Sequence, residues 1–152
     1  MMVKRLLYFD ADQCSGCLSC VTNCSQRNED CSGIENARLR LAIAPFTGDY
    51  RLTYCRQCAK PACAEACPVD AIVRHADGYL DVDYSLCIGC NACLSACPFG
   101  AMFYDPVGDK VIKCHTCQGE PACASVCPTG ALVWIEATEL AGRRRRAAAA
   151  TR

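Results

Sequence analysis

Four runs of closely spaced cysteines constrain this chain more than any other feature of its sequence. The run in CIGCNACLSACP has the spacing C-x2-C-x2-C-x3-C and is followed by proline. Three further runs also hold four cysteines and end with C-x3-C, so the runs account for 16 of the 17 cysteines in 152 residues. Their members are Cys14, Cys17, Cys20 and Cys24 in run one; Cys55, Cys58, Cys63 and Cys67 in run two; Cys87, Cys90, Cys93 and Cys97 in run three; and Cys114, Cys117, Cys123 and Cys127 in run four.

Disulfide bonds do not explain this density. The cysteine count is odd, and the basic amino terminus, MMVKRLLYFD, has no apolar run followed by a small-residue cleavage site. No stretch approaches the roughly 18 apolar residues that a membrane helix needs. We therefore expect a cytoplasmic protein without direct membrane insertion, whose thiols stay reduced and bind metal.

The spacing of the cysteines indicates which metal they bind. Structural zinc sites typically use two cysteine pairs separated by a longer loop, so a zinc-structured interaction module is kept only as a remote alternative. The C-x2-C-x2-C-x3-C-P run is the bacterial arrangement for [4Fe–4S] clusters, in which three thiolates bind one cubane and the fourth cysteine ligates another. Four runs predict four [4Fe–4S] clusters.

A repeat extends beyond the cysteines and indicates the fold class. Cys67, Cys97 and Cys127 lie 30 residues apart and open CPVDAI, CPFGAM and CPTGAL. Runs two and four share PACA, whereas runs one and three share the tighter C-x2-C-x2-C. This pattern is typical of a duplicated ferredoxin-like unit whose repeats stack to share a core. With about 40 residues per cluster, the clusters themselves must hold the fold together.

Short strands and helices are expected between the runs, giving an α+β fold. Residues 79–82 alternate as in a half-buried strand, and residues 102–113 indicate a hairpin with its turn at 105–109. A second hairpin, inserted between runs one and two, is expected on either side of Thr47-Gly48. Residues 132–140 should begin as a strand and end as a short helix, and each C-x3-C should lie on a short helix.

Residues outside the runs have ordinary interpretations. Cys31, the odd cysteine, is taken as a plain loop thiol, and His115 as a loop residue rather than a ligand, since both cysteines of CHTC are present. Trp134 is expected to pack at the edge of a module. The basic segment Arg143-Arg146 predicts a flexible tail. Because Lys plus Arg, 16, equals Asp plus Glu, 16, no basic surface supports nucleic-acid binding.

The ligand count also bears on function. Every run supplies four thiolates, which leaves no iron open for a substrate, as a catalytic metal centre would require. The sequence has no glycine-rich nucleotide-binding motif and no Ser and His arranged as a nucleophile and its base. We therefore expect no catalysis by this chain, only the transfer of electrons between closed one-electron centres.

The four runs, the segments PACAEACPVDAI and PACASVCPTGAL, and a first run without proline after Cys24 carry a resemblance to a known family. Over residues 4–136 the chain resembles the iron–sulfur electron-transfer subunits of the DMSO reductase type. Such subunits serve molybdenum and tungsten oxidoreductases, formate dehydrogenases, hydrogenases and CO dehydrogenase. The resemblance implies two fused bacterial-ferredoxin-like modules with four clusters in a line. The chain departs from respiratory formate dehydrogenase subunits in lacking their carboxy-terminal membrane helix, and it is short between Cys97 and Cys123.

The resemblance also implies how the runs pair, which the repeat alone leaves open, because a sequential duplication would pair run one with run two. In similar subunits the pairing is nested, run one with run four and run two with run three. Residues 1–54 would then hold run one and the inserted hairpin, 55–100 the inner module, 101–136 run four, and 137–152 the tail. The implied ligand sets are site A, with Cys14, Cys17, Cys20 and Cys127; site B, with Cys24, Cys114, Cys117 and Cys123; site C, with Cys55, Cys58, Cys63 and Cys97; and site D, with Cys67, Cys87, Cys90 and Cys93.

The partners expected from the resemblance are a catalytic oxidoreductase subunit and a second redox partner. A tungsten or molybdenum pterin enzyme for aldehydes or formate is favoured as the first, with a hydrogenase or CO dehydrogenase as alternatives. The second is another redox protein or further copies of this chain, end to end. The alternative function is a free polyferredoxin that diffuses between enzymes. The balanced charge and the apolar hairpin residues favour a fixed interface, the latter being Leu39, Leu41, Ile43 and Phe46.

Overall fold

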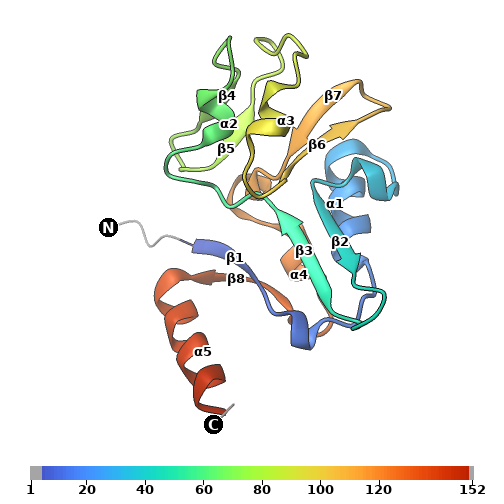
Figure 1. The fold of residues 1–152 in the computed structure, drawn as a ribbon, viewed down its shortest axis with the longest axis vertical. Coiled ribbons are helices and arrows are strands. Elements are labelled where there is room, and N and C mark those ends of the chain that lie inside the picture. Colours follow the sequence, from blue (N-terminus) through green and yellow to red (C-terminus); the bar gives the residue numbers. More distant parts are fainter. Residues whose placement is uncertain (1–4, 151–152) are drawn as a thin grey trace.

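The computed structural model describes residues 5–150 as short antiparallel strand pairs and mostly short helices (Figure 1). The α+β class expected from the sequence is confirmed. In chain order the elements are β1 (Arg5–Phe9), η1 (Ala11–Gln13), α1 (Ser19–Glu29), η2 (Ile34–Asn36), β2 (Leu39–Ile43), β3 (Tyr50–Tyr54), α2 (Ala62–Glu65), β4 (Ile72–Arg74), β5 (Leu80–Val82), α3 (Ala92–Ala96), β6 (Met102–Asp105), β7 (Lys110–Lys113), η3 (Thr116–Gly119), α4 (Ala122–Ser125), β8 (Leu132–Glu136) and α5 (Ala137–Ala150).

Four two-stranded antiparallel sheets connect the cysteine runs. Three are hairpins or near neighbours in sequence, β2–β3, β4–β5 and β6–β7, and the fourth pairs β1 with β8 from the two ends of the chain. The predicted inserted hairpin and the hairpin at 102–113 are therefore confirmed. In the β1–β8 pair Leu7 lies opposite Trp134, which brings run one and run four together.

Each of the four helices that carry a C-x3-C segment ends in a way the sequence explains. The helices α2, α3 and α4 have four or five residues and stop before a Cys-Pro pair, because proline disfavours helical geometry at the preceding residue and lacks an N–H. Cys24 is followed by Ser25 instead. As a result α1 continues for 11 residues, to a left-handed cap at Asp30.

Two hydrophobic cores divide the described chain into two modules. The outer core contains residues of α1, β1–β3, α4 and β8, and α1 packs against α4. The inner core contains residues from α2, α3 and β4–β7, and α2 packs against α3. Figure 1 shows the inner module at the top and the β1–β8 pair, with α5, at the bottom.

The hairpin β6–β7 belongs to both modules, although the predicted boundary at residue 101 placed it with run four. Met102 and Val111 are part of the inner core. Asp105 accepts a hydrogen bond of 2.6 Å from Asn36, and Lys110 forms an ion pair of 2.8 Å with Glu29, both residues of the outer module. The hairpin therefore connects run three to run four along the chain and also joins the two modules.

The segment predicted as a flexible basic tail, 137–152, is helical over most of its length. After β8 the chain forms α5, which is rich in Ala and Arg, residues of high helix propensity. Glu139 and Arg143 form an ion pair one turn apart at 3.2 Å. The predicted change from strand to helix is confirmed, but the helix has 14 residues rather than a few. Residues 151–152 of the predicted tail and 1–4 of the first predicted segment lie outside the described residues.

Candidate iron–sulfur sites

The first cysteines of each run lie on a loop with a recurrent backbone conformation. The third position of the first C-x-x-C is left-handed in all four runs, at Gly16, Gln57, Gly89 and Thr116. In three runs the amide of this residue donates to the sulfur of the first cysteine, Cys14, Cys55 or Cys114, at 3.3–3.5 Å. Such bonds favour a negatively charged sulfur.

A second recurrent turn holds the last cysteine of runs two, three and four. A left-handed residue follows each Cys-Pro, at Asp70, Gly100 and Gly130. A backbone amide beyond the turn then donates to the sulfur, at 3.2 Å for Cys67, 3.3 Å for Cys97 and 3.4 Å for Cys127. In run one, which lacks the proline, Cys24 accepts a 3.3 Å bond from the distant amide of Arg38 instead. The sequence repeat is thus a structural repeat with one altered copy.

Three hollows in the protein are each walled by four cysteines from two different runs. They enclose about 290, 340 and 330 Å³ of space free of protein atoms, open solvent included. The cysteines in their walls are Cys24, Cys114, Cys117 and Cys123 in the first; Cys55, Cys58, Cys63 and Cys97 in the second; and Cys67, Cys87, Cys90 and Cys93 in the third. These groups coincide with sites B, C and D. No group of three or more His, Cys, Asp or Glu within residues 5–150 converges as the ligands of one metal ion would.

Site A lies where run one meets run four. Cys20 and Cys127 both pack against the outer core. Burial, together with the nearby charge of Cys127, raises the pKa of Cys20 to about 11. Cys17 is exposed, and a hydrogen bond with Ser19 lowers its pKa. Site A is therefore open towards solvent on the side of Cys17.

The buried thiols suit a bound cationic cofactor. Burial raises the pKa of Cys93 to about 11 and that of Cys114 to about 12, and it raises the pKa of Cys123 as well. Such sulfurs are thiolates at neutral pH only beside compensating positive charge, which iron supplies. Four thiols around a hollow, with amides directed at the sulfurs, therefore fit a [4Fe–4S] cluster.

Thiols of successive predicted sites lie near one another. Cys20 of site A lies close enough to Cys123 of site B for its charge to raise the pKa of Cys123. Likewise the charge of Cys55 of site C raises the pKa of Cys114 of site B. The charge of Cys63 of site C raises the pKa of Cys93 of site D. The order along the molecule is A, B, C, D. The most exposed cysteines, Cys17 and Cys90, belong to the two end sites.

Two residues at the junction of sites B and C had no signal in the sequence. The side-chain amide of Gln57 donates to the carbonyl of Cys114 at 2.6 Å and accepts from the amide of Leu80 at 2.7 Å. Lys113 donates to the carbonyl oxygens of the same two residues. A glutamine and a lysine beside cysteines have no distinctive spacing, and only the fold shows that they meet.

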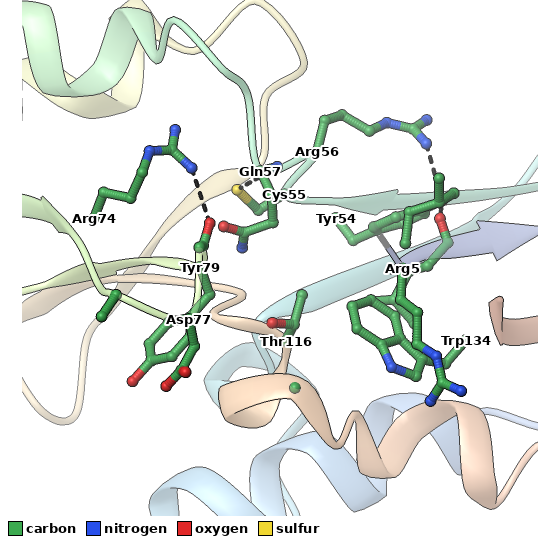
Figure 2. Close-up of a pocket in the computed structure, with 15 residues that line it drawn as sticks. Arg5, Tyr54, Cys55, Arg56, Gln57, Arg74, Asp77, Tyr79, Thr116 and Trp134 are labelled. Carbon is green, nitrogen blue, oxygen red and sulfur yellow. Dashed lines mark hydrogen bonds between the residues drawn. The ribbon is translucent and has the colours of Figure 1, made fainter. Parts of the chain in front are cut away.

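A cavity larger than these hollows, with about 1640 Å³ of space free of protein atoms, open solvent included, opens beside this junction (Figure 2). Arg5, Arg56 and Arg74 line it together with Trp134 and Tyr79. Arg56 donates to the hydroxyl of Tyr54 at 2.9 Å, and Arg74 donates to the carbonyl of Gly78 at 2.9 Å. The predicted packing role of Trp134 is confirmed, since it is partly buried against the outer core.

The remaining candidates keep their ordinary interpretations. Cys31 is a partly exposed thiol in the loop after α1. His115 is half-buried beside Tyr79, with ring centroids 6.3 Å apart, and burial lowers its pKa. Within residues 5–150 no helix has the length and apolar character needed to cross a bilayer.

Comparison with known proteins agrees with the thiol-lined sites. The model of the 4Fe–4S dicluster domain matches residues 46–137. Relatives include a subunit of the tetrathionate reductase of Archaeoglobus fulgidus, 36% identical over 87 residues, which are 55% of this chain and 40% of the relative. One polypeptide of the anaerobic dimethyl sulfoxide reductase of Haemophilus influenzae is 31% identical over 100 residues, which are 55% of this chain and 47% of the relative. The chain thus spans about half the length of these curated relatives or less.

A solved structure shares the fold. The active-site complex BamBC of benzoyl coenzyme A reductase contains a chain that superposes with a TM-score of 0.53 and 23% identity, covering 88% of this chain and 77% of that one. The family model covers more than half of the sequence. Cysteines of the matched segment line the hollows at the centre of both modules. The chain therefore belongs to the 4Fe–4S dicluster domain family.

Proposed function

We propose that this chain is a non-catalytic electron-transfer subunit that holds four [4Fe–4S] clusters in a line between a catalytic oxidoreductase subunit and a second redox partner. The observation that carries the proposal is the set of three hollows, each walled by four cysteines from two runs. At site A, Cys20 of run one and Cys127 of run four lie near one another against the outer core. When bound, the clusters supply one-electron redox chemistry without bond making or breaking. We propose a reducing compartment, the cytoplasm, because the thiols must stay reduced to bind iron.

The ligand sets of the proposal are sites A to D. The protein contributes the thiolates, the amides that donate to them and the exclusion of water. Cys63, Cys93, Cys114 and Cys123 are buried, whereas Cys17 and Cys90 reach the surface at opposite ends of the line. This arrangement supports entry of electrons at one end and exit at the other.

Exposed apolar side chains at both ends support fixed partners. Tyr50 of β3 packs so closely on the loop of run one that a Cβ at Gly16 would lie 2.6 Å from its ring, and the tip of the same hairpin carries Phe46, 99% exposed. At site D, Ile88 is 65% exposed next to Cys87. We take these side chains as the contacts that fixed partners would cover at the two ends.

The catalytic partner is proposed from resemblance. Relatives are named as subunits of tetrathionate reductase and of anaerobic dimethyl sulfoxide reductase. We assign this chain to a comparable complex with a molybdenum or tungsten pterin subunit for an aldehyde or formate. A hydrogenase or CO dehydrogenase is the alternative. Further copies of the chain, end to end, are the alternative to a separate second partner.

The metal content should be about 16 iron and 16 sulfide per chain after anaerobic purification, because four cubanes each hold four of both. Iron and acid-labile sulfide are measured against protein determined by amino-acid analysis. Zinc in stoichiometric amount, or iron near eight, would contradict the four-cluster proposal.

The complex should depend on the apolar side chains at the two ends. Phe46→Ser and Ile88→Ser are each expected to reduce binding of one partner at least tenfold, because each removes an exposed contact beside an end site. Mass photometry of the anaerobic complex measures this. Val107→Ser is the matched control, since Val107 is 84% exposed on the β6–β7 turn.

The free-carrier alternative makes a different prediction. A chain that purifies alone as a monomer and reduces several unrelated acceptors at equal rates would be a diffusing polyferredoxin. In that case neither Phe46→Ser nor Ile88→Ser would change its assembly.

A further inference from the structure

Lys113, at the end of β7, is a cation enclosed between sites B and C. The residue is 1% exposed. Its ammonium donates to the carbonyl oxygen of Leu80 at 2.6 Å and to that of Cys114 at 3.2 Å. Within residues 5–150 no carboxylate forms an ion pair with it. An ammonium buried without a counter-ion is costly, so the fold must supply negative charge by other means.

The two groups that the ammonium binds belong to the walls of two different sites. Leu80, whose carbonyl accepts from Lys113, lines the hollow of site C, and Cys114, whose carbonyl also accepts, lines that of site B. Gln57, from the loop of site C, bonds the same carbonyl of Cys114 as Lys113 does. The ammonium therefore lies at the junction of two ligand sets rather than within one of them.

The ligand sets on either side supply the missing negative charge once they are loaded. A [4Fe–4S] cluster with four thiolates carries about −2 when oxidised and about −3 when reduced. Two such groups beside one ammonium compensate it fully. The buried position also means that salt and water screen the interaction less than they would at the surface.

We propose that Lys113 is the common counter-ion of sites B and C and raises the reduction potentials of both inner clusters. This rests on the proposed function. Each inner cluster takes up one electron, no bond forms or breaks, and the added negative charge is stabilised by the ammonium. One cation beside both sites raises both potentials together, so the difference between the potentials of the two inner clusters stays nearly unchanged. Sites A and D, with Cys17 and Cys90 at the surface, obtain their compensation from solvent instead.

The test is Lys113→Met in the full, cluster-loaded chain, since methionine keeps most of the volume and removes the charge. An anaerobic dithionite titration followed by electron paramagnetic resonance measures the potential of each cluster. We expect two of the four to become harder to reduce by about tenfold or more in equilibrium constant, which is about 59 mV for one electron. The potentials of the other two clusters, at sites A and D, should stay unchanged. Lys113→Arg, which keeps the charge, should have inner potentials like those of the unaltered chain.

Lys110→Met is the matched control. Lys110 lies on the same strand and loses the same charge, but its ammonium pairs with Glu29 at 2.8 Å and is 30% exposed. The Lys110→Met variant should leave the reduction potentials of all four clusters unchanged. Unchanged inner potentials in Lys113→Met with full iron content would overturn the proposal, as would an equal shift of all four clusters or the same shift in Lys113→Arg.

If Lys113→Met loses iron, the iron content of two further variants tests the proposal. Lys113→Gln, which keeps a donor for the Leu80 carbonyl, is then compared with Lys113→Arg. Retention of about 16 iron only in the arginine variant supports a required charge, whereas loss in all three variants means that the site needs the shape of lysine and overturns the proposal. Iron well below 16 in the unaltered chain would instead refute the four-cluster function, which keeps the two failures distinct.

Discussion

Replacing Cys24 with alanine is expected to remove the cluster at site B and to leave the cluster at site A, which the first three cysteines of run one bind, in place. Cys24 is 6% exposed in α1, and its sulfur lies in the wall of the hollow formed with Cys114, Cys117 and Cys123. Its amide donor, Arg38, comes from outside the run. Iron should fall from about 16 to about 12 per chain, and the free energy of unfolding should fall too, because cluster binding and folding are coupled.

The identity of the lost cluster is tested by comparing variants. Under nested pairing, Cys24→Ala and Cys117→Ala remove the same paramagnetic signal, and Cys20→Ala removes a different one. If each run bound a cluster of its own, Cys24→Ala and Cys20→Ala would remove the same signal instead. Cys31→Ala is the control, since this thiol lies on a loop and lines none of the three hollows, and it should retain all four.

The sequence predicted the parts of the fold that repeat. The hairpins β2–β3 and β6–β7 follow from alternation and turn residues, and the short helices follow from C-x3-C-P, in which proline limits their length. Such features are encoded within a few residues, so they can be inferred without knowing the fold.

Contacts between distant segments were beyond local inference. The hairpin β6–β7 was assigned to one module, yet Asp105 and Lys110 bond Asn36 and Glu29 across the junction. The helix α5 replaces the flexible tail that its terminal position predicts, because Ala and Arg have high helix propensity. The role of Lys113 depends on the carbonyl of Leu80, 33 residues away, which no pattern near the lysine reveals.

Removing the clusters is expected to unfold the whole chain. Without them, residues 5–150 consist of four separate two-stranded sheets, three α-helices of four or five residues, the longer α1 and α5, and short 3-10 turns. Two-stranded hairpins and helices of four or five residues are at most marginally stable in water on their own. Cysteines also make up part of both cores, with Cys24, Cys114 and Cys123 in the outer one and Cys63 and Cys93 in the inner one. Iron removal therefore takes away the groups around which these cores close.

The measurement is far-ultraviolet circular dichroism before and after anaerobic treatment with a strong iron chelator, followed by addition of iron and sulfide. The strand and helix signal should fall to that of an unfolded chain and return as iron returns, with no separate cooperative transition for the apoprotein. Cys31→Ala should behave identically, since its thiol is not part of either core. An apoprotein that keeps its spectrum and melts cooperatively would show that packing alone holds the fold, and the thiol-lined hollows would then be preformed rather than built around their clusters. Since α1 alone among the cysteine-bearing helices has 11 residues, any residual structure should be found there and in α5, not in the inner module.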